Sequence, residues 1–408
     1  MSRVAKGWAQ RCVNCGATYE EDVRSFVCIR CSNLLELVKQ GPVSKDELYG
    51  EKGQPGIWGY RKSLPLESEV KAVSLSEGHT PLVLVSRVAA KLGLKNLYVK
   101  NEGQNPSGSF KDRGMTVAVT RAVQGGSKLL ICASTGNTAA SMAAYAARAG
   151  VTAMVTVPSG KVASGKLAQV YAYGAKIIRV QGDFDAALSI TLKVAAELKE
   201  LSVMNSVNPY RIEGQKTNAY EIYEQLGYKV PDYVALPVGN AGNISAIWKG
   251  FKELKEWGIS NSLPKMVGVQ AAGAQPLVEA FEHGRDSVIA VQPKTIASAI
   301  NIGNPASWKK ALAALRESKG IALAVTDEET IAARMDLSSS EGIFVEPASA
   351  VPLAALRKLM GRIESDATVV CICTGNGLKD QESVKVQLDS TPLVANPDQM
   401  VGLLAKTA

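Results

Sequence analysis

The sequence predicts an α/β protein with two open, mainly parallel sheets, because short apolar runs alternate with amphipathic stretches along most of it. Six apolar runs are expected as strands: Leu129–Ala133, Ala153–Val157, Lys176–Val180, Tyr233–Pro237, Met266–Gln270 and Val369–Cys373. Five amphipathic stretches are expected as helices: Thr138–Arg148, Ser164–Tyr173, Phe184–Leu198, Ile244–Glu256 and Ala350–Met360. Strands that alternate with helices of this length are typical of βαβ units. A chain of 408 residues exceeds one ordinary core, so two sheet domains that meet at a cleft are expected.

The composition excludes several classes of protein. Hydrophobic residues make up 46% and charged residues 21%, which is ordinary for a globular protein. The net charge of +8 comes from scattered basic residues, so no nucleic-acid surface is expected, although positive charge suits phosphorylated ligands. No apolar run has the length of a membrane span, and Met1 to Gln10 lack the apolar segment of a signal peptide. We therefore expect a cytoplasmic protein that does not bind membranes.

The N-terminus carries two CxxC pairs, Cys12 with Cys15 and Cys28 with Cys31, separated by 12 residues. Each pair offers two thiolates from one tight turn, and four thiolates satisfy tetrahedral zinc. The alternative is free or disulfide-paired cysteine, which a cytosolic location disfavours. Residues 1–40 are therefore predicted to form a zinc-ribbon-like module with a structural metal. Residues 41–75 are polar and rich in Gly, Pro and charge, and are expected as an arm or linker on the main body.

A helix that follows residue 110 is predicted to begin with a reactive lysine. Pro106 and Gly108 predict a turn, Ser109 is a plausible helix cap, and Lys111 follows directly. An amine at a helix N-terminus feels positive dipole and loses water, and both effects lower its pKa. Such a lysine forms Schiff bases and acts as a base. The alternative is a solvated lysine on the first turn of a helix.

Polar loops follow several of the expected strands, where ligands bind in parallel sheets. Ser134, Thr135, Asn137 and Thr138 follow the first strand and offer hydroxyls, an amide and helix N–H groups, which suit a carboxylate. The alternative is an ordinary capped helix start.

A glycine-rich loop follows the strand at Tyr233–Pro237 and suits a phosphate, because its backbone N–H groups can approach closely. It consists of Gly239, Asn240, Ala241, Gly242 and Asn243. The spacing matches neither a nucleotide P-loop nor a dinucleotide-binding fingerprint.

Two further loops complete the expected site. Thr374 offers a neutral hydroxyl at the tip of the last strand, and Arg211 brings positive charge after Asn205 and Ser206. One amine, a phosphate cradle, a carboxylate cradle and a second basic site are the set that a pyridoxal phosphate enzyme acting on an anionic amino acid needs.

The sequence resembles the threonine synthases, of the fold-type II pyridoxal phosphate family, over nearly the whole chain. The motifs that carry the resemblance are Glu77 to Leu82, Asn105 to Gly114, Ser134 to Thr138, Asn205 to Thr217, Gly239 to Asn243, Thr295 to Pro305, Glu346 to Ser349 and Thr374 to Asp380. The resemblance implies a tryptophan synthase β-like fold, with a large cofactor-binding domain over 76–124 and 209–408 and a small substrate domain over 125–208. One departure is Asn376, where many relatives have His.

The resemblance also implies a role for each loop. Lys111 would form the Schiff base, Phe110 would pack against the cofactor ring, Asn137 would bond its 3-hydroxyl, and Thr374 would face its pyridine nitrogen. The loop from Gly239 to Asn243 would hold the cofactor phosphate. The substrate carboxylate would bind Ser134, Thr135 and Thr138. The substrate phosphate would bind Asn205, Ser206, Arg211 and Asn243.

The implied reaction converts O-phospho-L-homoserine and water to L-threonine and phosphate, in an enzyme that is often a homodimer. The two separate anion sites favour this reaction over that of a threonine or serine dehydratase, which needs only the cofactor site and a carboxylate site. A cysteate synthase, which takes phosphoserine and sulfite, is another alternative. A zinc-ribbon binding protein with an inactive pyridoxal-phosphate-type body is an alternative of a different class.

Overall fold

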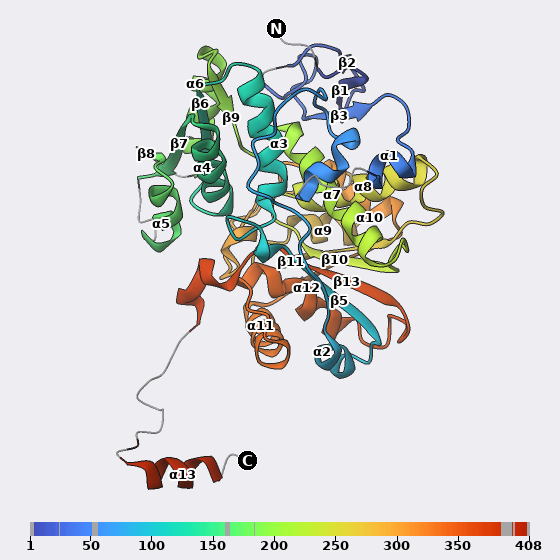
Figure 1. Cartoon of the computed structure of the whole chain (residues 1–408), viewed down its shortest axis with the longest axis vertical. Coiled ribbons are helices and arrows are strands. Elements are labelled where there is room, and N and C mark those ends of the chain that lie inside the picture. The colour runs from blue at the N-terminus through green and yellow to red at the C-terminus, as the bar shows by residue number, and fades with distance from the viewer. Residues whose placement is uncertain are drawn as a thin grey trace.

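The computed structural model describes residues 4–23, 25–50, 56–159, 164–182, 184–384, 394 and 396–405 (Figure 1). Three sheets organise this part of the chain: a three-stranded sheet near the N-terminus, a six-stranded sheet and a four-stranded sheet. Part of the predicted arm, residues 51–55, lies outside the described residues. No helix in the described part of the chain is long and apolar enough to cross a membrane.

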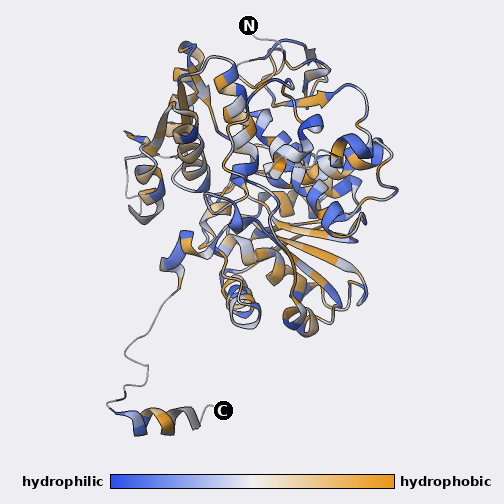
Figure 2. Ribbon diagram, in the orientation of Figure 1, coloured by the Kyte–Doolittle hydropathy of each residue, from blue (hydrophilic) through white to orange (hydrophobic). Residues whose placement is uncertain are grey.

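The six-stranded sheet is parallel apart from one edge. Its strand order is β12-β11-β10-β13-β5-β4, and only β4 runs antiparallel to its neighbour. The strands are β4 Leu82–Leu84, β5 Asn96–Asn101, β10 Tyr233–Pro237, β11 Lys265–Ala271, β12 Ile321–Val325 and β13 Thr368–Cys373. Figure 2 shows these strands mostly in orange, as expected for a parallel sheet covered on both faces.

Two apolar cores cover the two faces of this sheet. Within β13, Val369, Cys371 and Cys373 face one core, and Val370 and Ile372 face the other, which is the two-residue period of a strand. The first core packs the sheet against α2, α11 and α12 (Ser86–Lys91, Asp327–Glu341 and Pro347–Lys358). The second packs it against α7, α8, α9 and α10 (Pro209–Gln225, Gly242–Glu256, Pro276–Glu282 and Trp308–Glu317).

The four-stranded sheet is entirely parallel, in the order β8-β7-β6-β9. Its strands are β6 Leu129–Ala133, β7 Thr152–Pro158, β8 Lys176–Val180 and β9 Leu201–Val203. Helices α4, α5 and α6 (Asn137–Ala149, Ser164–Ala172 and Phe184–Glu197) connect them. The predicted α/β class is confirmed, and every predicted strand and helix is present with ends that differ by at most a few residues.

One predicted helix cap is wrong. The residue that caps α3 (Lys111–Gln124) is Phe110, without a side-chain cap, and the hydroxyl of Ser109 is buried with no partner among the described residues. Asp112 instead accepts hydrogen bonds from the Ser107 N–H and hydroxyl, both at 2.6 Å, which ties the turn to the helix. The turn therefore closes through Asp112, a function that Ser109 was expected to perform.

The N-terminal module is a small antiparallel sheet of β1, β2 and β3 (Trp8–Cys12, Thr18–Tyr19 and Leu35–Lys39). It lies at the end of the molecule opposite to α2 and α11 (Figure 1). The described part of 41–75 contains α1 (Lys45–Tyr49) and a 3₁₀ helix over Gly56–Ser63, which buries Trp58. A last helix, α13, spans Pro397–Ala405.

Helices α3 and α7 touch backbone to backbone. A Cβ atom on Gly214 would lie 1.8 Å from the Arg113 carbonyl oxygen, and one on Gly114 would lie 2.5 Å from that of Arg211. Next to this contact the Arg113 guanidinium donates to the carboxylates of Glu102 and Glu221, all three being fully buried. The glycines therefore set the distance between the two helices, and the ion pairs set their rotation.

Gly214→Ala should destabilise the protein, although Gly→Ala inside a helix ordinarily stabilises by about 0.5–1 kcal/mol. The added methyl group clashes with backbone that has no space to move, so a net loss of about 1–3 kcal/mol is expected from urea unfolding. Gly125→Ala is the matched control, because the nearest atoms to its Cβ lie at 3.4 Å. Equal stability of the two variants would contradict the close contact.

Candidate functional site

A cavity lies where the loops of the six-stranded sheet meet α3, α4 and α7. The predicted site residues that line it are Phe110, Lys111, Asn137, Ser206, Arg211, Gly239, Asn240, Ala241, Gly242, Asn243 and Thr374. Gln215, Ile300 and Ala299 also line it; they lie within motifs that carry the resemblance, but no role was predicted for them. The fold thus brings together loops that lie far apart in the chain.

Lys111 begins α3 at this cavity, and a large fraction of its amine is neutral at physiological pH. Burial and the nearby Arg211 guanidinium together lower the pKa of Lys111 to about 7, while the Glu346 carboxylate opposes the shift. The amine lies 4.3 Å from the centre of the Phe110 ring. A neutral buried amine has the free electron pair that a nucleophile or a base needs.

The glycine-rich loop between β10 and α8 is preorganised for an anion. Ala241, the residue that caps α8, has a φ of 64°, which is rare for a residue with a side chain and costs energy. Gly239 lies close to neighbouring backbone, because its Cβ would lie 3.0 Å from the Cα of Ile300. The side-chain nitrogen of Asn243 is buried and has no partner among the described residues. Strain and an unpaired donor at one helix N-terminus indicate a bound anion.

Arg211 brings a second positive charge to the cavity from the first turn of α7. Its Nη1 donates to the Met204 carbonyl at 2.9 Å, whereas its buried Nε has no partner among the described residues. Burial lowers the pKa of Arg211 to about 10, so it remains a cation near neutral pH. A buried guanidinium with donors to spare suits a phosphate or carboxylate.

Thr374 lies at the end of β13, where its hydroxyl pairs with that of Ser349 at 3.0 Å. Ser349 also accepts from the Gly375 N–H at 2.8 Å. The hydroxyl of Thr374 is thus oriented by a neighbour that is itself fixed to the backbone.

Four predicted residues do not line the cavity. The hydroxyl of Ser134 accepts from the Gly136 N–H at 3.2 Å, Thr135 is half-buried in the same loop, and Thr138 is half-buried in the first turn of α4. Both amide atoms of Asn205 bond the backbone of Ala133, at 3.0 and 2.9 Å. Asn205 therefore holds the end of β6 in place rather than pointing into the cavity.

Glu346 is a buried acid beside the cavity to which the sequence analysis assigned no role. Its two carboxylate oxygens accept from the Asn137 amide at 3.1 and 3.0 Å. Burial raises the pKa of Glu346, and the hydrogen bond from Asn137 opposes that shift. The available signal was the motif from Glu346 to Ser349 at the start of a helix, but nothing in it indicates the contact with Asn137.

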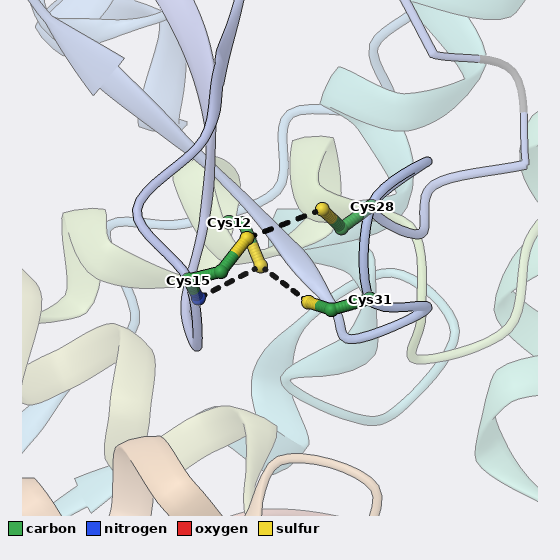
Figure 3. A group of neighbouring side chains, drawn as sticks. All are labelled: Cys12, Cys15, Cys28 and Cys31. Carbon is green, nitrogen blue, oxygen red and sulfur yellow. Dashed lines mark hydrogen bonds between the residues drawn. The ribbon is translucent and has the colours of Figure 1, made fainter.

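The four N-terminal cysteines form one cluster. Their sulfur atoms all lie within 4.8 Å of one another, with Cys12 and Cys31 at 3.4 Å and Cys15 and Cys28 at 3.6 Å. Figure 3 shows the sulfur atoms pointing toward one another from two loops. Tetrahedral zinc with Zn–S bonds of about 2.3 Å needs sulfur atoms about 3.8 Å apart, so the cluster fits this metal.

The sequence matches the family described as pyridoxal-phosphate dependent enzyme over residues 73–375. The chain is 52% identical to the threonine synthase of Methanocaldococcus jannaschii, with 94% of this chain and 98% of the relative covered. It is 50% identical to that of Methanosarcina acetivorans, with 92% and 93% covered. Among solved structures, the processed form of threonine deaminase isoform 2 from Solanum lycopersicum has a similar fold, at 24% identity and a TM-score of 0.62, with 73% and 83% covered.

The low pKa of Lys111 should make the cofactor-free protein more stable as the pH rises. Unfolding returns this amine to a pKa of about 10.4, so between pH 7 and 10 the unfolded chain holds one more proton. The stability of the wild type relative to Lys111→Met should therefore increase by about 1.4 kcal/mol per pH unit, measured by urea unfolding. Exposed Lys128 supplies the control variant, Lys128→Met. If the difference in free energy of unfolding between the wild type and Lys111→Met did not change with pH, the lowered pKa of Lys111 would be contradicted.

Proposed function

Because the chain belongs to the pyridoxal-phosphate dependent enzyme family and, within it, to the threonine synthases, we propose that its cavity holds pyridoxal phosphate together with O-phospho-L-homoserine. The enzyme is a lyase that converts this substrate and water to L-threonine and phosphate. The observation that carries the site assignment is the pairing of a neutral buried amine, Lys111, with a buried guanidinium, Arg211, that has a donor to spare. Such a pair serves a phosphorylated amino acid better than an unphosphorylated one.

The cavity fits the cofactor, as judged by the unpaired Asn243 amide and the strained Ala241. The loop from Gly239 to Asn243 would hold the phosphate of the cofactor, and Lys111 would bond to it covalently. Phe110 would pack against the ring, Asn137 would bond the 3-hydroxyl, and Thr374 would face the ring nitrogen. When bound, pyridoxal phosphate accepts the electron pair that a departing proton leaves next to the amine.

Arg211, Ser206 and Asn243 would bind the phosphate of the substrate. Ser134 and Thr135, in the loop after β6, and Thr138, in the first turn of α4, would bind its carboxylate. The hydrogen bonds of Asn205 to Ala133 support a role in which Asn205 positions this loop, in place of direct contact with the phosphate.

Lys111 is the base of the reaction in this proposal. Its amine, about half of which is neutral at pH 7, takes the proton from the α carbon of the substrate and later returns a proton. A proton is then lost from the β carbon, and its electron pair expels phosphate from the γ carbon, where Arg211 stabilises the charge of the leaving group. A proton returned to the γ carbon forms the methyl group, and water then adds at the β carbon, which yields L-threonine. Glu346 fixes Asn137 through two hydrogen bonds and so keeps the amide turned toward the cavity edge.

We further propose that Cys12, Cys15, Cys28 and Cys31 hold a structural Zn²⁺, which the spacing of their sulfur atoms supports. All four ligands are protein thiolates, so no position is left for a catalytic water. Because enzymes of this fold family are often homodimers, we propose a homodimer in the cytoplasm. Light scattering on the purified protein measures its mass and so tests the dimer.

Purified enzyme should release phosphate and form L-threonine from O-phospho-L-homoserine, and it should show the visible absorption of a bound cofactor. Lys111→Ala should abolish both the visible band and turnover, because no other amine lines the cavity among the described residues. Phosphate release and threonine are measured together. Deamination of L-threonine or L-serine without activity on the phosphorylated substrate would overturn the assignment.

Arg211→Ala should raise KM for O-phospho-L-homoserine by about tenfold to a hundredfold, since a hydrogen bond to a charged group contributes about 1.5–3 kcal/mol. The visible band should persist, because the cofactor phosphate is assigned to the other anion site. Arg148→Ala, an exposed arginine on α4, is the control. An unchanged KM would remove Arg211 from the substrate phosphate site.

A further inference from the structure

We propose that Asp22, in the loop between the two cysteine pairs, is a positioning residue that ties the N-terminal module to the two helices carrying Lys111 and Arg211. Its carboxylate bonds one side chain from each helix. Through this contact it holds the first turn of α7, and with it Arg211, in the geometry that binds the substrate phosphate. The contact itself does not depend on the proposed function, but its effect on substrate binding rests on the proposed function.

The carboxylate of Asp22 is nearly buried and has several partners. Its Oδ1 accepts from the Tyr210 hydroxyl at 2.8 Å, and its Oδ2 accepts from Arg121 Nε and Nη2 at 2.9 and 2.5 Å. Gln10 of β1 also donates to Oδ1 at 2.8 Å. The side chains of Arg121 and Asp22 are only 10% and 12% exposed, so water screens this ion pair little. Asp22 thus joins β1, α3 and α7 at one point.

Tyr210 precedes Arg211 in the first turn of α7, and its side chain is buried. Burial and the Asp22 charge raise the pKa of the Tyr210 hydroxyl, so it stays protonated and donates. The first turn of a helix lacks intrahelical partners for its N–H groups and is held from outside. Here the Asn208 side chain accepts from the Tyr210 N–H at 3.0 Å, and Asp22 holds the far end of the ring.

Arg211 depends on this support because it has little of its own. Among the described residues its guanidinium makes one hydrogen bond, to the Met204 carbonyl, and its Nε is unpaired. Its direction is therefore set by the backbone of the turn that Tyr210 anchors. A shift of about 1 Å in that turn is enough to lower the efficiency of a site.

The cysteine cluster controls the loop that carries Asp22. That loop begins at one cysteine pair and ends at the other, and within it the Tyr19 hydroxyl contacts the Cys28 sulfur at 3.1 Å. Gln10, which bonds Asp22, also accepts from the Val23 N–H at 2.9 Å and lies two residues before Cys12. A metal held by both pairs closes the loop and orders Asp22.

The module has a second attachment that does not involve Asp22. Lys249 of α8 donates to the Leu37 carbonyl of β3 at 2.5 Å and pairs with Glu213 of α7. Removing Asp22 should therefore loosen the first turn of α7 without releasing the module. This separates a positioning role from general unfolding.

The test compares Asp22→Ala and Tyr210→Phe in the metal-loaded holoenzyme with Arg11→Ala, which breaks an exposed ion pair of the same module. KM for O-phospho-L-homoserine should rise about tenfold in both variants, with kcat within about twofold of the wild type. The visible cofactor band and the zinc content should be unchanged. Asp22→Asn should give a smaller rise in KM, since its amide oxygen still accepts from Tyr210.

Hydrogen exchange supplies a readout that does not depend on activity. Amides of the first turn of α7 should exchange about tenfold faster in Asp22→Ala, and in the wild type after zinc is removed by a chelator, while those of α12 should not change. Faster exchange with an unchanged KM would reduce Asp22 to a structural residue and overturn the proposal. Unchanged exchange would also overturn it. If neither the variants nor the wild type form threonine, the proposed function fails. Hydrogen exchange alone then tests whether Asp22 holds the first turn of α7.

Discussion

The site depends on the contact between α3 and α7, where two helices approach until their backbones touch. Gly114 and Gly214 leave no side chain in between, so the Arg113 and Arg211 carbonyls lie against the facing helix. Lys111 begins one of these helices, and Arg211 lies in the first turn of the other. The separation of the amine and the guanidinium is therefore a property of helix packing. A flexible loop would not hold two buried basic groups at one cavity against the repulsion between their charged forms.

The buried charges near this contact belong to two groups with opposite character. Arg113, Glu102, Glu221 and Lys100 satisfy one another through direct hydrogen bonds, with side chains that are at most 1% exposed. Such a network adds little net stability but specifies orientation, because each partner has one arrangement that satisfies it. Lys111 has a pKa lowered to about 7 by its burial and by Arg211. The paired charges hold the scaffold, and the unpaired ones are left for ligands.

The sequence predicted those features that depend on local pattern. The βαβ alternation, the glycine-rich loop at Gly239 and the lysine at a helix start all have short-range signatures, and the structure brings them to one cavity. It did not predict features that depend on tertiary neighbours. The amide side chain of Asn205 is of a type that often binds anions, but both its amide atoms bond the backbone of Ala133. Glu346 has the sequence context of an ordinary helix start, and only the fold puts it against Asn137.

Residues of the N-terminal part contact α7 at its start, middle and end. Asp22 holds its first turn through Tyr210, and the Trp8 ring lies 5.0 Å from the Lys216 amine near its middle. The Tyr60 hydroxyl bonds Glu224 at 2.7 Å near its end. These residues precede position 73, where the match to the enzyme family begins. On its other side α7 is held against α3 by the glycine contact and by the Arg113–Glu221 ion pair, so contacts on two sides fix the position of the helix that carries Arg211.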